Sequence, residues 1–290
     1  MSTAADYQII KEGRWRLAVR RTDWTDELKD KVLQLVHAQT RSKHPQTVVF
    51  DWAVAEGVKS YYLKVFHGGG LGSAALKDLF RESRAFRFWR QGLALTAAGF
   101  SVPPTLAAGE LRRFRRLQRA FVVTAKIDGQ SLPDYLAHLR KTLDGRARTK
   151  EKRAGIVRLA RLIRDFHRQG FVHGDLIATN LLIASSSQGD LSVFFMDNDR
   201  TGRFSMRLFP SLWKRNLIQL NRMPLPEISL QDRMRFLHAY LEISRFSGGE
   251  AKFARWLEQR TRQRRKECDS VDDVASFRQL MRWDCIGTPN

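Results

Sequence analysis

The chain has 290 residues, of which 43% are hydrophobic, and it carries a formal net charge of +21. This length and apolar fraction exclude wholesale disorder and allow one large domain or two joined lobes. The charge predicts a polyanionic partner: a nucleic acid, an acidic membrane surface or a phosphorylated substrate. Two cysteines without metal-ligand spacing indicate a reducing, cytoplasmic setting, and the sequence predicts neither a signal peptide nor a membrane-spanning helix.

The first half of the chain is predicted to form strands around two helices. Residues 25–39 have a helical apolar face, and another helix is expected to end near Leu95. A turn at Glu56–Gly57 predicts an antiparallel hairpin whose second strand contains Lys64. Strands are expected at 14–20, 47–54, 59–66, 105–108 and 120–125.

The second half is predicted to be mainly helical. An Asp-Gly pair indicates a hinge at 126–129, and the strongest amphipathic helix is expected at 149–169. Short strands are expected at 181–184 and 191–196, and a later helix starts at Ser229 with Asp232 in its first turn. The order predicts an α+β fold of two lobes with a cleft between them, 1–126 and 127–290.

The strongest functional signal is the segment H-x-D-x-x-x-x-N, formed by His173, Asp175 and Asn180. Asp197 then follows the apolar strand 191–196. This order is typical of phosphoryl transfer from ATP: Asp175 orients and deprotonates the acceptor hydroxyl, while Asn180 and Asp197 bind Mg²⁺. A loop with a capping Asp would explain His173–Asp175 alone, but it does not explain the later Asn and Asp. Asp199 is either a second carboxylate of this site or a partner of Arg200.

Lys64 is the predicted phosphate-binding lysine. A lysine between apolar residues of a strand needs an anionic partner, unless the strand is at an edge and the lysine faces solvent. Glu82, early in the following helix, is the predicted carboxylate partner of Lys64. The alternative for Glu82 is a surface residue that offsets neighbouring arginines.

The loop that covers the phosphates is harder to place. The glycines at 68–72 follow the Lys64 strand, whereas a phosphate-covering loop should precede it. We therefore interpret the glycines as a connection to the next helix. The predicted phosphate contacts are Ser42 and Lys43, in a segment without glycine.

These residues resemble the lipopolysaccharide kinase family, which includes core heptose kinases and Kdo kinases and is related to protein kinases. The resemblance covers roughly residues 45–245. Beyond the kinase motifs, a Ser-Arg-Ala helix start and a Phe-Leu-x-x-Tyr-Leu segment are particular to this family. The matching segments are 61–66, 82–90, 99–110, 173–180, 196–200 and 232–241.

The resemblance implies a bilobal protein-kinase-like fold, with an antiparallel N-lobe sheet, one main N-lobe helix and a largely helical C-lobe. It also implies ATP and Mg²⁺ as cofactors and a sugar hydroxyl of the lipopolysaccharide inner core, heptose or Kdo, as acceptor. Lys64, Asp175, Asn180 and Asp197 match the family's motif positions. Relatives often have a glutamate where this chain has Phe88.

The implied partner is a lipid-linked anionic glycan at the cytoplasmic face of the inner membrane of a Gram-negative bacterium. The enzyme would be peripheral there, and nucleic acid is not expected as a partner. Two alternatives remain: a kinase of the same fold for another small-molecule or protein hydroxyl, and a basic pseudokinase or binding module.

Overall fold

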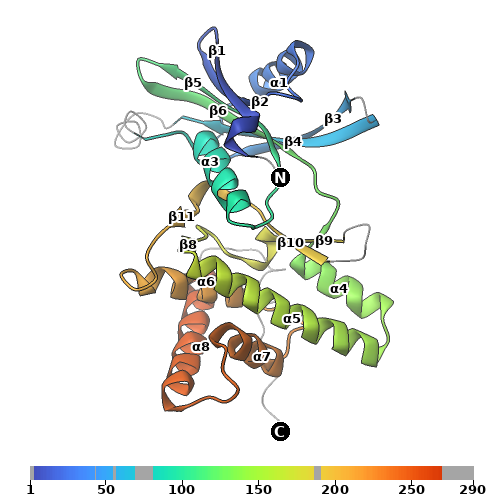
Figure 1. Ribbon diagram of the computed structural model, residues 1–290, viewed down its shortest axis with the longest axis vertical. Helices are drawn as coiled ribbons and strands as arrows, with labels where there is room; N and C mark the ends of the chain where they lie inside the picture. The colour runs from blue at the N-terminus through green and yellow to red at the C-terminus, as the bar shows by residue number, and fades with distance from the viewer. Residues whose placement is uncertain (1–2, 43, 55–56, 69–80, 186–190, 270–290) are drawn as a thin grey trace. The chain divides into compact units, whose positions relative to one another are not determined.

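The structure is a computed structural model that describes residues 3–42, 44–54, 57–68, 81–185 and 191–269 (Figure 1). The chain divides into two compact units. The first comprises residues 1–128 together with 194–200, and the second comprises 129–193 and 201–290. Residues 194–200, which include Asp197, therefore belong with the N-terminal unit although they lie far along the sequence.

The first unit contains an antiparallel sheet of six strands in the order β1-β2-β5-β6-β4-β3. The expected strands are present, and β1 is an additional one. The arginine-rich segment 111–119 has no predicted strand, but in the structure it extends β5 and β6 into a hairpin. The strands are β1 (Tyr7–Glu12), β2 (Trp15–Arg20), β3 (Gln46–Val54), β4 (Gly57–His67), β5 (Thr105–Arg113) and β6 (Arg116–Ala125).

Helix α1 (Asp26–Ala38) packs on one face of this sheet. The Thr25 side chain accepts a hydrogen bond from the backbone N–H of Leu28 and so caps the helix. Leu28, Val32 and Val36 of α1 are buried against side chains of β2, β4 and β6 that include Leu63 and Val65. Burial of this apolar surface holds α1 on the sheet.

Helix α3 (Arg84–Ala97) packs against a different set of sheet side chains. Ala85 and Phe88 of the helix join Phe66 and Val122 of the sheet in a second buried cluster. Because successive side chains of a strand point to opposite faces, Phe66 and its neighbour Lys64 lie on the face that α3 covers. The sheet therefore presents Lys64 toward α3.

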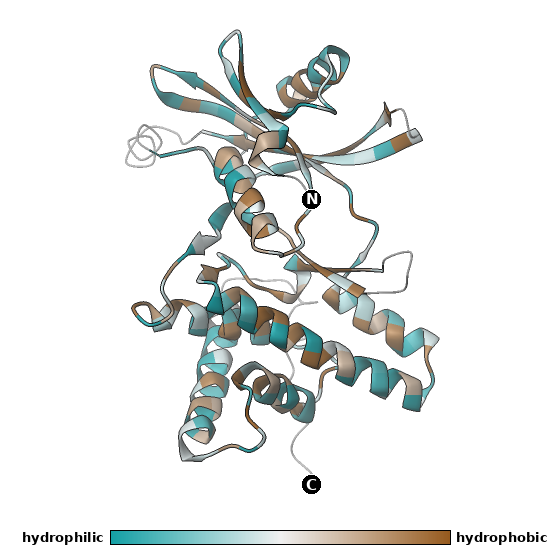
Figure 2. Cartoon of the chain, in the orientation of Figure 1, coloured by the Kyte–Doolittle hydropathy of each residue, from teal (hydrophilic) through white to brown (hydrophobic). Residues whose placement is uncertain are grey.

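The second unit is largely helical, with short strands between the helices. Its fold and that of the first unit confirm the predicted α+β class. Figure 2 shows hydrophobic and hydrophilic residues along α5, its longest helix. The helices are α4 (Leu132–Thr142), α5 (Gly145–Arg168), α6 (Pro210–Arg222), α7 (Leu230–Leu241) and α8 (Gly248–Asp269); the strands are β7 (Gln130–Ser131), β8 (Phe171–Val172), β9 (Leu181–Ser185), β10 (Leu191–Phe195) and β11 (Gly202–Arg203).

The helix starts of this unit follow from their capping residues. Ser229 and Asp232 form the reciprocal capping box at α7 that the sequence predicted. Asp144 caps α5, which begins a few residues before the expected 149–169 segment. Among the described residues, none of the helices combines the length and apolarity needed to cross a bilayer.

Candidate active site

The structure pairs Lys64 with Asp197. Lys64 Nζ lies 2.5 Å from Asp197 Oδ1, and both residues belong to the first unit. Asp197 follows β10 and has a backbone φ of 53°, so the chain turns sharply at this residue. Its side chain is 49% exposed, which leaves the carboxylate accessible to a ligand.

Glu82 is not brought to Lys64. It precedes Ser83, the N-cap of α3, rather than lying within the helix as expected. Its carboxylate accepts a hydrogen bond from the Arg90 guanidinium at 3.2 Å. At the position where family members often have a glutamate, Phe88 is buried in the sheet contact. In this structure the carboxylate partner of Lys64 is therefore Asp197.

Asp199 pairs with Arg84, whereas the sequence suggested Arg200. Arg84 Nε lies 2.5 Å from Asp199 Oδ2, and the Asp199 side chain is only 5% exposed. The Arg84 guanidinium also stacks over the Phe66 ring, 4.8 Å from its centroid. The two carboxylates of the 197–199 segment thus differ in environment: Asp199 is buried and neutralised, while Asp197 is accessible.

The second unit holds the segment that contains Asp175. The His173 side chain is completely buried, and its Nδ1 accepts a hydrogen bond from the backbone N–H of Asp175 at 3.0 Å. Asn180 donates from Nδ2 to the Asp175 carbonyl at 2.9 Å. These bonds fix the backbone on both sides of Asp175. They also leave the Asn180 amide oxygen available as a ligand for a cation.

Two amide side chains of α6 support the same loop, and the sequence analysis did not identify them. Asn216 accepts from the His173 N–H at 2.9 Å and donates to its carbonyl at 2.6 Å. Gln219 accepts from the Leu176 N–H and donates to the Gly174 carbonyl. The signal in the sequence was the i, i+3 spacing of Asn216 and Gln219, which places both polar side chains on one face of an amphipathic helix. Together they supply hydrogen-bond partners to backbone groups of the loop.

His167 extends this network into α5 and α7. Its Nε2 donates to Asn216 Oδ1 at 3.2 Å, and its Nδ1 accepts from the Tyr240 hydroxyl at 2.8 Å. Burial lowers the pKa of His167 to about 4, and the hydrogen bond to Asn216 opposes this shift. The imidazole is therefore neutral at physiological pH and serves as a structural link.

Each unit contains a predicted metal ligand whose side-chain oxygen suits a hard divalent cation. Mg²⁺ takes one or two protein oxygens and completes its shell with phosphate oxygens and water. Asp197 and Asn180 offer a carboxylate and an amide oxygen of this kind. Within the described part of the chain, three or more His, Cys, Asp or Glu side chains nowhere gather into a metal-binding group.

The predicted phosphate contacts are only partly described. Ser42 lies between α1 and β3, where its hydroxyl accepts from the His44 N–H at 3.2 Å. Lys43 and the glycines at 69–72 lie outside the described residues. Gly68 continues the pairing of β4 with β6, and a Cβ there would lie 1.9 Å from the Leu117 carbonyl oxygen, so only glycine fits.

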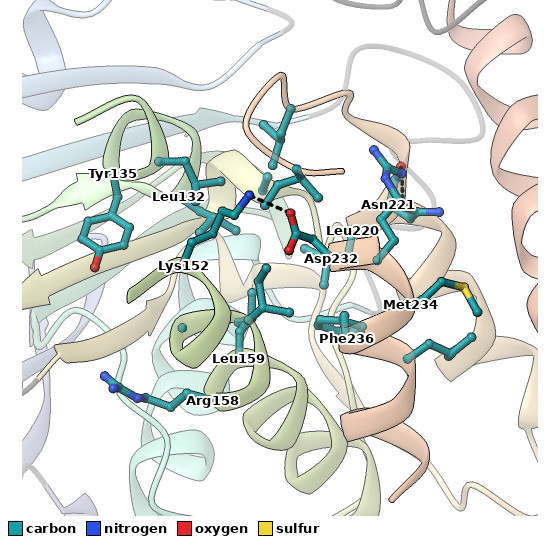
Figure 3. A pocket seen from close by; sticks show the side chains of 18 of the residues that line it. Leu132, Tyr135, Lys152, Arg158, Leu159, Leu220, Asn221, Asp232, Met234 and Phe236 are labelled. Atoms are coloured by element: carbon teal, nitrogen blue, oxygen red, sulfur yellow. Dashed lines mark hydrogen bonds and ion pairs between the residues drawn. The ribbon is translucent and has the colours of Figure 1, made fainter. Parts of the chain in front are cut away.

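The second unit also contains an apolar cavity of about 200 Å³ (Figure 3). Its walls come from α4, α5, α6, α7 and α8 together with β9 and β10. Lys152 and Asp232, a charged pair in the wall, bind each other at 2.7 Å, and Lys152 also donates to the Glu227 carbonyl. Apolar side chains make up most of the remaining wall, among them Leu132, Leu136, Leu159, Leu220, Met234 and Phe236.

Comparison with known proteins gives the family. The model of the lipopolysaccharide kinase (Kdo/WaaP) family matches residues 30–240. No curated protein sequence matches the chain. A solved structure described as WaaP in complex with acyl carrier protein is 20% identical with a TM-score of 0.58, and the match covers 86% of this chain and 98% of that one. This likeness supports the kinase-like fold.

Two further solved structures are more distant. The Rio2 kinase of Chaetomium thermophilum, as its ADP/Mg²⁺-phosphoaspartate complex, is 16% identical with a TM-score of 0.35, covering 90% of this chain and 83% of that one. The PknI kinase domain of Mycobacterium tuberculosis is 11% identical with a TM-score of 0.33, covering 85% and 78%. The family match spans most of the chain, which therefore belongs to the lipopolysaccharide kinase (Kdo/WaaP) family and is an ATP-dependent kinase.

Proposed function

We propose that the enzyme transfers the γ-phosphoryl group of ATP to a sugar hydroxyl, on heptose or Kdo, of the lipopolysaccharide inner core. The observation that carries the proposal is the support of the Asp175 loop. His173, Asn180 and the α6 amide Asn216 all hold the backbone of this loop, in which Asp175 is the acidic residue. Such pre-organisation is expected of a catalytic base.

In the proposed reaction Asp175 accepts the proton of the sugar hydroxyl as the new oxygen–phosphorus bond forms. The bond between the γ-phosphorus and the bridging oxygen breaks, and ADP leaves with that oxygen. Lys64 binds phosphate oxygens, and Ser42 and Lys43 contact the phosphates from the segment between α1 and β3. Asn180 and Asp197 would hold Mg²⁺, which would supply positive charge to the phosphate oxygens.

The test is ATP-dependent phosphorylation of purified core acceptors that carry Kdo alone or Kdo with heptose. Asp175→Asn is expected to lower kcat roughly 10²–10⁴-fold, as for loss of a general base. Asp165→Asn, an exposed carboxylate of α5, is the matched control and should keep full activity. Unchanged turnover in Asp175→Asn contradicts the mechanism, and the acceptor that is phosphorylated identifies the sugar.

We further propose that the enzyme works on the cytoplasmic face of the inner membrane as a peripheral protein. The support comes from four exposed cations of α5: Arg146, Lys150, Arg153 and Arg161, which we call the basic stripe. Their spacing of four, three and eight residues places them on one helical face. Anionic lipid head groups and core phosphates attract such a surface.

An acylated carrier protein is a second proposed partner. The similar WaaP structure is a complex with acyl carrier protein. In the present chain, the specific observation is the mostly apolar cavity of the second unit, in whose wall Lys152 and Asp232 bind each other. A mostly apolar wall suits a hydrocarbon chain, because binding removes apolar surface from water without stranding a polar group.

A further inference from the structure

Helix α3 contains no aspartate or glutamate between Arg84 and Ala97. In protein kinases the corresponding helix supplies a glutamate that pairs with the phosphate-binding lysine. Here position 88 is a buried phenylalanine, and Lys64 takes its carboxylate from Asp197. The contact between α3 and the catalytic residues must therefore use another side chain.

That side chain is Arg84, the first residue of α3. Ser83 caps the helix through the backbone N–H of Phe86, which fixes the position of this first turn. The Arg84 guanidinium lies between the Phe66 ring and the buried Asp199 carboxylate. A carboxylate that is almost completely buried needs a cation, and Arg84 supplies it.

The 197–199 segment is also held by a hydrogen bond of its own. Asn198 is completely buried and donates from Nδ2 to the Phe195 carbonyl, which closes a tight turn. Asp197 stands at the start of this turn with a left-handed backbone. Through its pair with Asp199, Arg84 of α3 binds the turn that carries Asp197.

We propose that the Arg84–Asp199 ion pair orients Asp197 for metal binding, so that Arg84 is a positioning residue of the kinase. In this chain α3 carries a cation, Arg84, that acts on the metal-binding carboxylate of Asp197. In protein kinases the helix instead carries a glutamate that pairs with the phosphate-binding lysine. The inference rests on the proposed role of Asp197. It explains how α3 can influence the site although the helix has no carboxylate to pair with Lys64.

The experiment measures the dissociation constant of ATP for the full chain, once in excess Mg²⁺ and once in EDTA. The ratio of the EDTA value to the Mg²⁺ value is the Mg²⁺-dependent gain in affinity. Arg84→Ala is expected to reduce the Mg²⁺-dependent gain roughly tenfold, as for other residues that orient a metal ligand. ATP affinity in EDTA, which depends on Lys64, should change little. Arg84→Lys should restore most of the gain because it keeps the cation.

Arg90→Ala is the matched control, because it breaks the Arg90–Glu82 pair beside the same helix. Asp199→Asn removes the buried charge without changing side-chain shape, and it should match Arg84→Ala even if that variant folds poorly. An undiminished Mg²⁺-dependent gain in both variants overturns the inference. If the wild-type chain itself shows no gain, and Asp197→Asn is indistinguishable from it, the proposed metal role fails and the inference fails with it.

Discussion

Individual buried polar residues hold the Asp175 loop in place. His167, Asn216 and His173 form a chain of hydrogen bonds that starts at Tyr240 and ends at the backbone of the motif. None of these side chains is positioned to react, since each uses its polar atoms for other protein groups. Their contribution is to keep the Asp175 backbone fixed before any substrate arrives.

Acid should destabilise the protein through His167. Its pKa is about 4 in the folded chain and about 6.5 when unfolded, so the unfolded state binds more protons between these values. The stability contribution is complete above pH 6.5 and is lost as pH falls toward 4. Between pH 7.5 and 5 the free energy of unfolding should fall by about 2 kcal/mol from this residue.

Urea unfolding at several pH values measures this effect. His167→Gln, which does not titrate, should be less stable at pH 7.5 but should lose less stability on acidification. An exposed histidine, His138→Gln on α4 of the same unit, is the control for general changes in charge. Equal pH dependence in His167→Gln and the wild-type chain would contradict the assignment.

The spacing of the motif was enough to identify Asp175, Asn180 and Asp197 as candidates, because a loop of this kind is a local structure. The partners of Asp199 and Glu82 were not predictable in the same way. Asp199 meets Arg84 only after the chain has folded back from β10 to α3. Asn216 and Gln219 likewise reach the loop across the fold: their i, i+3 spacing places them on one helix face, but it does not say which segment that face contacts.

At the scale of elements, most helices and strands were predictable from apolar periodicity and capping residues. The exceptions have a common cause. The segment 111–119 is rich in arginine, so its apolar alternation is weak, yet it pairs as β5 and β6 because backbone hydrogen bonds and neighbouring strands fix it. β1 was not predicted because it is mostly exposed at the edge of the sheet and so has little apolar alternation.

The apolar cavity offers a prediction about α5. Gly155 lines the cavity, and a Cβ placed on it meets no atom within 4 Å. Gly155→Leu should therefore fold, and it should gain roughly 1 kcal/mol of helix stability, because glycine is a poor helix residue. The added side chain would occupy space that we assign to an acyl chain.

Binding of a fluorescent long-chain acyl probe measures the consequence. Gly155→Leu should weaken probe binding at least roughly tenfold, the loss expected when about 1.4 kcal/mol of apolar contact is removed. Gly145→Leu is the control, because this residue lies at the exposed start of the same helix and outside the cavity wall. Equal probe binding by both variants would mean that the cavity is not the acyl site.

At the scale of the whole molecule, the cations behind the net charge of +21 have different roles. Several arginines are internal structural groups, such as Arg119, which donates to carbonyls at the end of α1. Others are neutralised by carboxylates, as Arg164 is by Glu242. The basic stripe of α5 is different, because within the described residues none of its four cations takes part in an ion pair.

Membrane binding should depend on this stripe. Replacing its four cations with glutamine should reduce sedimentation with vesicles that contain anionic phospholipid by tenfold or more, since each cation near such a surface contributes roughly 1 kcal/mol. Binding of the wild-type chain should also weaken as salt is raised.

A matched variant removes the same charge from α8, through glutamine at Lys252, Arg255, Arg260 and Lys266. It should bind anionic vesicles more strongly than the stripe variant. Equal loss in the two variants would show that net charge alone determines binding, and no loss in either would contradict peripheral association through α5.

The left-handed backbone at Asp197 restricts which residues natural mutation can place there. Most L-residues resist a φ of 53°, whereas asparagine, aspartate and glycine accept it. In a lineage that no longer needed phosphoryl transfer, asparagine or glycine could therefore replace Asp197 without loss of protein abundance. Proteins with other residues at this position would fold less well and be degraded. An abundance scan of all substitutions at this codon would separate the demand of the turn from the demand of the chemistry.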